Sequence, residues 1–223
     1  STDAAVVGNI AEFGTESLAA VGIVGSFIST IIWILAQTRS AISAIISQNL
    51  GAGNLKSLTS FPAQAILFNV SLSFILLFST YFFIEDILLF LRAEGKILEF
   101  SKEYYYIRIW GFPLTLFTFA IFGIFRGLQN TFWPMIIALI GTIINVGLDF
   151  IFVYGLEDFI EPMGVKGAAW ASLIAQLVMA LLALLLVVTK TNISLKLKRK
   201  IHPEVNRLVA MSFNLFIRSV ALN

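Results

Sequence analysis

Five stretches of this sequence contain no Asp, Glu, Lys or Arg over 17 to 23 consecutive residues. They are residues 17–38, 63–84, 109–125, 127–148 and 167–189. A helix needs about 20 residues to cross the roughly 30 Å hydrocarbon core of a bilayer. Four stretches reach that length, and the third reaches it if residues 104–107 join it, with Arg108 near its end. The sequence therefore predicts an all-α integral membrane protein with at least five membrane-crossing helices.

The composition supports this fold class. Of the residues, 58% are apolar and 13% are charged, against about 25% charged residues in a typical soluble domain. The chain begins at Ser1 inside an apolar segment, and a further apolar run begins near Leu208. We expect a six-helix transmembrane bundle over residues 1–189 in which helix 1 is truncated. A basic linker over residues 190–207 and the start of helix 7 over residues 208–223 would follow.

The charged residues predict the orientation in the membrane. Ten acids are expected in the loops on one side: Glu12, Glu16, Glu85, Asp86, Glu94, Glu99, Glu103, Glu157, Asp158 and Glu161. Basic residues crowd the linker after helix 6: Lys190, Lys196, Lys198, Arg199, Lys200 and Arg207. Lys56 and Arg126 lie in turns expected on the linker side, and five bases are expected opposite: Arg92, Lys96, Lys102, Arg108 and Lys166. Because basic residues mark the cytoplasmic face, we expect the linker to be cytoplasmic. Anionic membrane lipid is then its expected partner, and a net charge of +2 gives no argument for nucleic acid.

Two polar residues of the fifth helix stand out at membrane depth. Asp149 follows directly on an uncharged stretch and precedes the apolar residues 150–154. Asn145 lies four residues earlier, so both side chains share one helix face. A charged group at this depth is costly and indicates function by default. The alternative is that Asp149 lies near enough to the outer surface to be solvated, or pairs with a neighbour.

Asp3, in the remnant of helix 1, is the second acid expected inside the membrane. Together with Asp149 it forms a candidate two-carboxylate site that could share a proton or bind a cation. We expect Arg39 and Arg126 to extend toward the cytoplasmic surface rather than to act as counter-ions. We expect no metal site or cofactor: His202 is the only histidine, no cysteine is present, and a zinc site needs several such ligands.

The sequence also weighs against an enzyme. It contains no Gly-x-Ser-x-Gly elbow and no His-Glu-x-x-His motif, which would mark common nucleophile or metal chemistry. A purely structural membrane subunit remains an alternative, but it would not need the Asn145 and Asp149 pair. The small-residue spacing from Gly123 to Gly127 predicts close helix packing.

Short motifs at the helix boundaries resemble the multidrug and toxic compound extrusion (MATE) family. Helix 1 has Asp3-Ala-Ala-Val-Val-Gly8 and, further on, Leu18-Ala-Ala-Val-Gly22. The turns have Gln48-Asn-Leu-Gly-Ala-Gly-Asn54 and Phe125-Arg-Gly-Leu-Gln-Asn-Thr131 with Pro134. Helices 5 and 6 have Asn145-Val-Gly-Leu-Asp149 and Gly164-Val-Lys-Gly-Ala-Ala-Trp-Ala-Ser172. Asn214-Leu-Phe-Ile-Arg218 is similar to the start of helix 7 in the DinF-like branch.

This resemblance implies a twelve-helix transporter of two six-helix lobes in the plasma membrane, of which this chain is the N-terminal lobe. It implies export of organic, often cationic, compounds in exchange for H⁺ or Na⁺, and a second lobe as partner. The family's ion-coupling roles fall on Asp3, Asn145 and Asp149, and its helix 6 hydroxyl on Ser172. A lipid-linked oligosaccharide flippase of the same superfamily is an alternative. Such a flippase would be expected to place several Arg or Lys in its cavity for pyrophosphate, and this lobe has few at depth.

Overall fold

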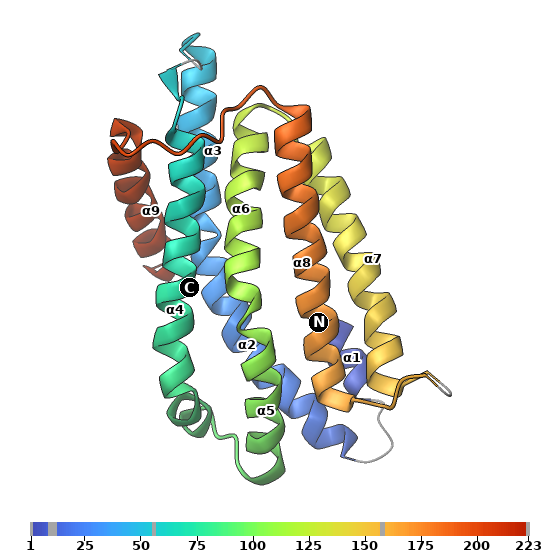
Figure 1. Cartoon of the computed structure of the whole chain (residues 1–223). Coiled ribbons are helices and arrows are strands. Elements are labelled where there is room, and N and C mark those ends of the chain that lie inside the picture. The colour runs from blue at the N-terminus through green and yellow to red at the C-terminus, as the bar shows by residue number, and fades with distance from the viewer. Residues whose placement is uncertain (1, 9–12, 55–56, 157–158, 222–223) are drawn as a thin grey trace. The chain divides into compact units, whose positions relative to one another are not determined.

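The computed structural model describes residues 2–8, 13–54, 57–156 and 159–221. This part of the chain forms nine α-helices, and its only other backbone pairing is an isolated bridge between Leu156 and Ile160. The helices are α1 (Thr2–Val7), α2 (Gly14–Leu35), α3 (Gln37–Gly51), α4 (Phe61–Phe90), α5 (Gly95–Arg108), α6 (Gly111–Gly127), α7 (Phe132–Tyr154), α8 (Gly164–Lys190) and α9 (Pro203–Ala221) (Figure 1). The predicted all-α class is confirmed.

Four helical segments are long and apolar enough to cross a membrane within the described residues, and a bent pair makes a fifth. Each corresponds to one of the uncharged stretches. They are Gly14–Gly51, Phe61–Phe90, Phe132–Tyr154, Gly164–Lys190 and the pair of α5 with α6. The chain is therefore a multi-pass membrane protein.

The third stretch is bent where the sequence predicts a continuous helix. The axes of α5 and α6 differ by 47°, with the break at Ile109 and Trp110. Pro113 lies in the first turn of α6 and has no amide hydrogen for the carbonyl four residues before it. The missing hydrogen bond permits a bend at this point.

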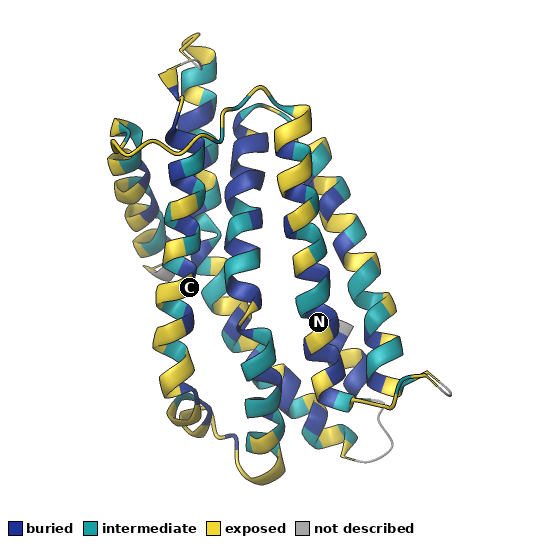
Figure 2. Cartoon of the chain, viewed as in Figure 1, coloured by how far each residue is buried: buried dark blue, intermediate teal, exposed yellow. Residues whose placement is uncertain are grey.

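Large apolar side chains cover the outside of the helices. On α4 the exposed side chains include Phe74, Ile75, Phe78, Phe82 and Phe83, and Figure 2 shows exposed positions repeating along this helix. A soluble protein exposes apolar patches of this size only at interaction sites.

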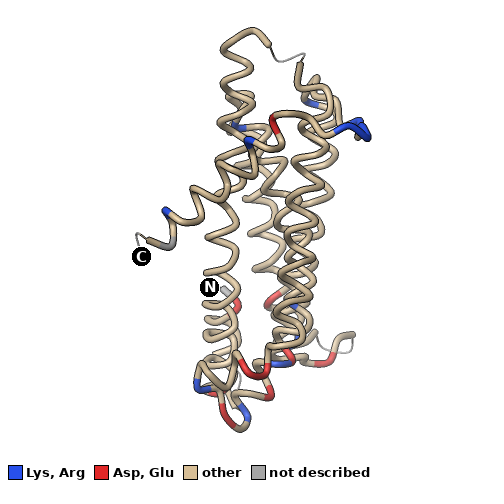
Figure 3. Tube along the Cα trace, turned by 90° about the vertical axis from the view of Figure 1, so that its left-hand side faces the viewer, with Lys and Arg blue, Asp and Glu red and all other residues tan. Residues whose placement is uncertain are grey.

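The chain divides into two compact units. Unit 1 is Ser1–Thr30, Phe74–Phe112 and Leu139–Val178, and unit 2 is Ile31–Ser73, Pro113–Ala138 and Met179–Asn223. By sequence, unit 1 has twelve acids and five basic residues, whereas unit 2 has ten basic residues and one acid, Glu204. Figure 3 shows the acidic and basic positions along the trace. Of the residues used above to predict orientation, Glu12, Lys56, Glu157 and Asp158 lie outside the described part.

Unit 2 is built on close contact between α3 and α6. A Cβ atom added at Gly127 would lie 2.6 Å from Ile46 Cβ, and one at Gly123 would lie 2.8 Å from the Arg39 carbonyl oxygen. Only glycine lets the two backbones approach this closely. The predicted packing role of the Gly123–Gly127 spacing is therefore confirmed.

The basic linker is attached to α4 through Gln64. The Gln64 Nε2 group donates to the carbonyls of Lys198 at 3.0 Å and Lys200 at 2.8 Å, and Oε1 accepts from the His202 amide at 2.8 Å. The next helix, α9, begins at Pro203, inside the segment expected to be linker. Proline suits the first helical position because that amide has no intrahelical acceptor.

Candidate functional site

The predicted site residues lie on three helices of unit 1. Helix α1 carries Asp3, α7 carries Asn145 and Asp149, and α8 carries Ser172. Asp3, Asp149 and Ser172 are buried, at 4%, 0% and 5% exposure, and Asn145 is half-buried. The structure thus brings together residues that are up to 169 positions apart in sequence.

Asp3 is the centre of a hydrogen-bond network. Its Oδ2 atom accepts from the Tyr104 hydroxyl at 2.6 Å and from the Ser172 hydroxyl at 2.9 Å. The Asn145 Nδ2 group donates to Ser172 Oγ at 3.2 Å. Asn145 therefore helps to direct the Ser172 hydroxyl toward the carboxylate. Two hydroxyl groups from different helices thus donate to one carboxylate oxygen of Asp3.

The short helix α1 is fixed at both ends. Asp3 connects its first turn to α5 and α8, and the Tyr154 hydroxyl of α7 donates to the Val6 carbonyl at 2.6 Å. That carbonyl is one of the last of α1, where a helix has no internal donor to offer. Helix α1 is therefore held to α5, α7 and α8 by hydrogen bonds.

Asp149 lies one turn from Asn145 but is in a different environment. Both of its carboxylate oxygens are buried and have no hydrogen-bond partner within the described residues. Its charge interacts with those of Asp3 and Arg108. A buried carboxylate without hydrogen bonds costs several kcal/mol if it is ionised and uncompensated. Asp149 thus has unused capacity to bind a proton or a cation.

Three further residues belong to this site and were not predicted. Tyr104 donates to Asp3, and Arg108 interacts electrostatically with Tyr104 and Asp149. The Arg108 Nε group and the Gln176 Oε1 atom are buried without a partner in the described part. Gln176 lies against Gly111, where an added Cβ would overlap its amide. Arg108, expected near the end of the third membrane helix on the side opposite the linker, is the last residue of α5.

One feature of the sequence could have pointed to two of these three residues. Tyr104 and Arg108 are four positions apart and so share a helix face, and they directly precede the third uncharged stretch. The described residues contain no group of three His, Cys, Asp or Glu that could hold a metal ion.

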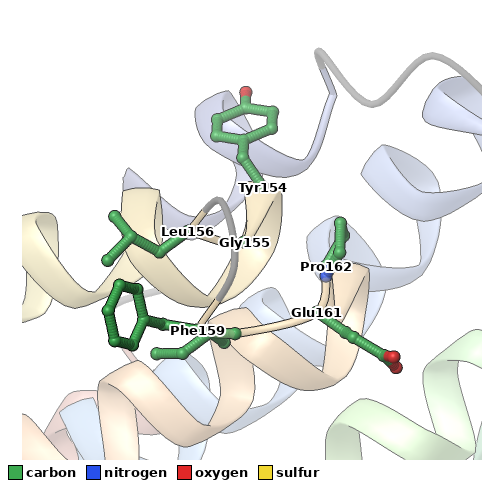
Figure 4. Close-up of a pocket in the computed structure, with 7 residues that line it drawn as sticks. Tyr154, Gly155, Leu156, Phe159, Glu161 and Pro162 are labelled. Atoms are coloured by element: carbon green, nitrogen blue, oxygen red, sulfur yellow. The ribbon is translucent and has the colours of Figure 1, made fainter.

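A separate pocket lies in the loop between α7 and α8. It has a volume of about 770 Å³ and is lined by Tyr154, Gly155, Leu156, Phe159, Ile160, Glu161 and Pro162. Figure 4 shows the Glu161 carboxylate pointing away from the Phe159 ring. None of the predicted site residues lines this pocket. The pocket is formed by one connecting loop and shares no residue with the predicted site, and we assign it no ligand.

Known proteins similar to this chain identify its family. The family model described as MatE matches residues 2–151. DNA damage-inducible protein F of Escherichia coli is 26% identical over 99% of this chain and 47% of its own length. The probable multidrug resistance protein NorM of Thermotoga maritima is 26% identical over 76% of this chain and 36% of its own length. Protein DETOXIFICATION 43 of Arabidopsis thaliana is 32% identical over 46% of this chain and 18% of its own length.

Solved structures have the same fold. A MATE protein in the bent conformation superposes with a TM-score of 0.89 at 23% identity, over 98% of this chain and 48% of the other. The Vibrio cholerae MATE transporter VcmN in the bent form gives a TM-score of 0.86 at 20% identity, over 99% and 49%. This chain spans less than half the length of the relatives reported above. The family model covers most of the chain, and the fold agrees throughout: the chain belongs to the MatE, or multidrug and toxic compound extrusion, family.

Proposed function

We propose that this chain is the N-terminal lobe of a secondary active antiporter that exports organic, often cationic, compounds in exchange for H⁺ or Na⁺. The proteins it resembles include a probable multidrug resistance protein, and a solved relative is a multidrug resistance MATE family transporter of the MOP superfamily. The protein acts as a transporter and not as an enzyme. It resides in the plasma membrane with the linker after α8 in the cytoplasm, and a second lobe completes the transport path.

The observation that carries the ion-coupling proposal is Asp149. Its two carboxylate oxygens are buried and lack hydrogen-bond partners in the described part of the chain, beside the network of Asp3. With Asp3 and Asp149 ionised and Arg108 cationic, this group of three has one excess negative charge. One H⁺ or one Na⁺ would neutralise it.

The coupling acts through helix α1. When Asp3 and Asp149 are both ionised, Arg108 relieves only part of the repulsion between them. In this state the lobe binds organic substrate with higher affinity. Cation or proton binding at Asp149 removes the repulsion on Asp3, which accepts hydrogen bonds from Tyr104 of α5 and Ser172 of α8. Helix α1 then repacks and substrate leaves outward. Such coupling requires the ion to bind the two conformations with different affinity.

The test substitutes Asp149→Asn in the full-length protein and measures efflux of a fluorescent organic cation from proteoliposomes under a proton gradient and, separately, a sodium gradient. We expect gradient-driven efflux to be lost while membrane insertion is retained. Glu99→Gln is the matched control, since Glu99 is an exposed acid of the same unit paired with Lys96 at 2.9 Å. Undiminished efflux by Asp149→Asn would refute the assignment, and the gradient that drives wild-type efflux identifies the ion.

A flippase of the same superfamily and a structural subunit are the alternative functions. A flippase would move a lipid-linked oligosaccharide and would show no gradient-driven efflux of organic cations. A structural subunit would show no transport in either assay, and Asp149→Asn would then affect only stability. The same proteoliposomes therefore separate the antiporter from both alternatives.

A further inference from the structure

The basic linker between α8 and α9 packs on unit 2 and does not hang free. Figure 1 shows it running from the end of α8 across α4 to the start of α9. Ile193 and Leu195 are half-buried and pack on the buried core of unit 2, whereas Ser194 and Lys196 are exposed. This alternation is typical of a chain that lies along a surface with one side facing it. We call residues 193–202 the strap.

The second half of the strap is fixed by hydrogen bonds. Gln64 binds its backbone at three residues, as described above. The Lys198 Nζ group donates to Thr59 Oγ1 at 3.2 Å, and His202 Nε2 lies 3.1 Å from the Ser57 carbonyl oxygen. A segment that is already fixed loses less conformational entropy when it binds a partner. The strap is therefore preorganised for binding.

Gln64 also sets the depth of the strap in the membrane. It lies in the first turn of α4, which has 30 residues. Such a helix is about 45 Å long, roughly the thickness of a bilayer with its headgroup regions, so its first turn lies among headgroups. Where the linker leaves α8, the Lys190 ammonium nitrogen lies 5.5 Å from the centre of the Trp133 ring at the start of α7. Tryptophan is enriched at membrane surfaces, which agrees with this depth.

The exposed side chains of the strap combine positive charge with apolar surface. Four bases and two large apolar residues are exposed: Lys196, Lys198, Arg199, Lys200, Leu197 and Ile201. The strap itself has no acid, and the one acid of unit 2 by sequence, Glu204, lies 3.5 Å from Arg207. Clustered bases attract anionic headgroups, and apolar side chains among them enter the boundary between headgroups and acyl chains.

We propose that the strap is a binding surface for an anionic lipid bilayer. Its bases bind the phosphate groups of one leaflet, and Leu197 and Ile201 enter the boundary below them. Because the strap leads directly into α9, lipid binding holds the start of α9 at the membrane surface. The strap shares no residue with the ion-coupling site, and its binding to lipid does not depend on the proposed transport function.

The experiment measures hydrogen exchange of the backbone amides of residues 194–201 by mass spectrometry. The full-length protein is placed in nanodiscs of phosphatidylcholine alone and of phosphatidylcholine with phosphatidylglycerol. A basic residue near an anionic surface contributes about fivefold to affinity, so phosphatidylglycerol should slow exchange in the strap at least about tenfold. Added salt should reverse most of this protection, because it screens exposed charges.

The variants test the charges separately from the apolar residues. The double variant Lys196→Gln with Arg199→Gln should lower the affinity for the anionic surface about twentyfold, the loss of two such contributions. The control is Arg92→Gln with Lys96→Gln, which removes the same charge from exposed residues of unit 1 and should leave the protection unchanged. Leu197→Ser with Ile201→Ser should reduce the protection that persists at high salt.

Gln64→Ala tests the preorganisation of the strap. It keeps every charge and every apolar residue of the strap but removes the three hydrogen bonds to its backbone. Exchange in phosphatidylcholine should become faster, and phosphatidylglycerol should protect the strap less than in the wild type, since the strap must then be ordered on binding.

Three results would overturn the proposal. The first is equal exchange of the strap in the two lipids. The second is a loss of protection in the Arg92 and Lys96 control as large as in the Lys196 and Arg199 variant, since protection would then follow total charge. The third is stronger protection by soluble polyglutamate or RNA in phosphatidylcholine nanodiscs than by phosphatidylglycerol, which would make an acidic macromolecule the partner.

Discussion

Substituting Gly127 by alanine tests the packing on which unit 2 depends. The new Cβ atom would lie 2.6 Å from Ile46 Cβ, 2.8 Å from Ile46 Cγ2 and 3.0 Å from the Ser43 carbonyl oxygen. None of these is the free end of a flexible side chain. Ile46 is β-branched and stiff at χ1, and Ser43 contributes backbone, so α3 and α6 must move apart.

The expected change in the free energy of unfolding follows from two opposed effects. Forcing an extra methyl group into a packed contact costs about 1–3 kcal/mol. Alanine recovers up to about 1 kcal/mol over glycine through helix propensity, but Gly127 is the last residue of α6, where that gain is smaller. We therefore expect Gly127→Ala to lower the free energy of unfolding by about 1–2 kcal/mol.

Gly147→Ala is the matched control. Gly147 lies inside α7, and an added Cβ would meet nothing within 4 Å. This variant should gain about 0.5–1 kcal/mol from helix propensity alone. The assay is unfolding of the purified protein in detergent, followed by circular dichroism at increasing dodecyl sulfate. If Gly127→Ala were as stable as Gly147→Ala, the close approach of α3 and α6 would be refuted.

Two further substitutions test single hydrogen-bonded groups. Tyr104→Phe removes the 2.6 Å hydrogen bond to Asp3. It should reduce gradient-driven efflux at least about tenfold, which is the effect of losing one hydrogen bond to a charged group. Tyr106→Phe, on the same helix, is the control and should not reduce efflux. Gln64→Ala removes three bonds to the linker and should speed tryptic cleavage at residues 198–200, because an attached backbone must open before a protease can bind it. Wild-type efflux in the first case, or wild-type cleavage in the second, would contradict these assignments.

The membrane helices could be predicted because one property decides them. A bilayer excludes charge over about 20 residues, so the uncharged stretches and the described spans correspond one to one. The bend between α5 and α6 was missed because a single proline near a helix start is compatible with both a straight and a bent continuation. What decides between them is the packing of neighbouring helices, which the sequence does not express locally.

The candidate site was only partly predictable for a related reason. Asp149 stands out because an acid among apolar residues is rare at membrane depth. Tyr104 does not stand out: it lies in a run of three tyrosines, and aromatic residues at membrane surfaces are common. Its role depends on which face of α5 meets α1, and only the fold shows that its hydroxyl reaches Asp3. The place of Arg108 in the site likewise depends on the face of α5 on which it lies, and the sequence alone does not show its interaction with Asp149.

The distribution of charge bears on the ion-coupling proposal. Unit 1 has an excess of acids by sequence and contains a buried carboxylate, Asp149, that lacks hydrogen-bond partners among the described residues. A buried charge is retained at a cost, and Arg108 offsets that cost only in part. A cation bound at Asp149 would remove the remaining cost, which is the physical basis of the proposed coupling.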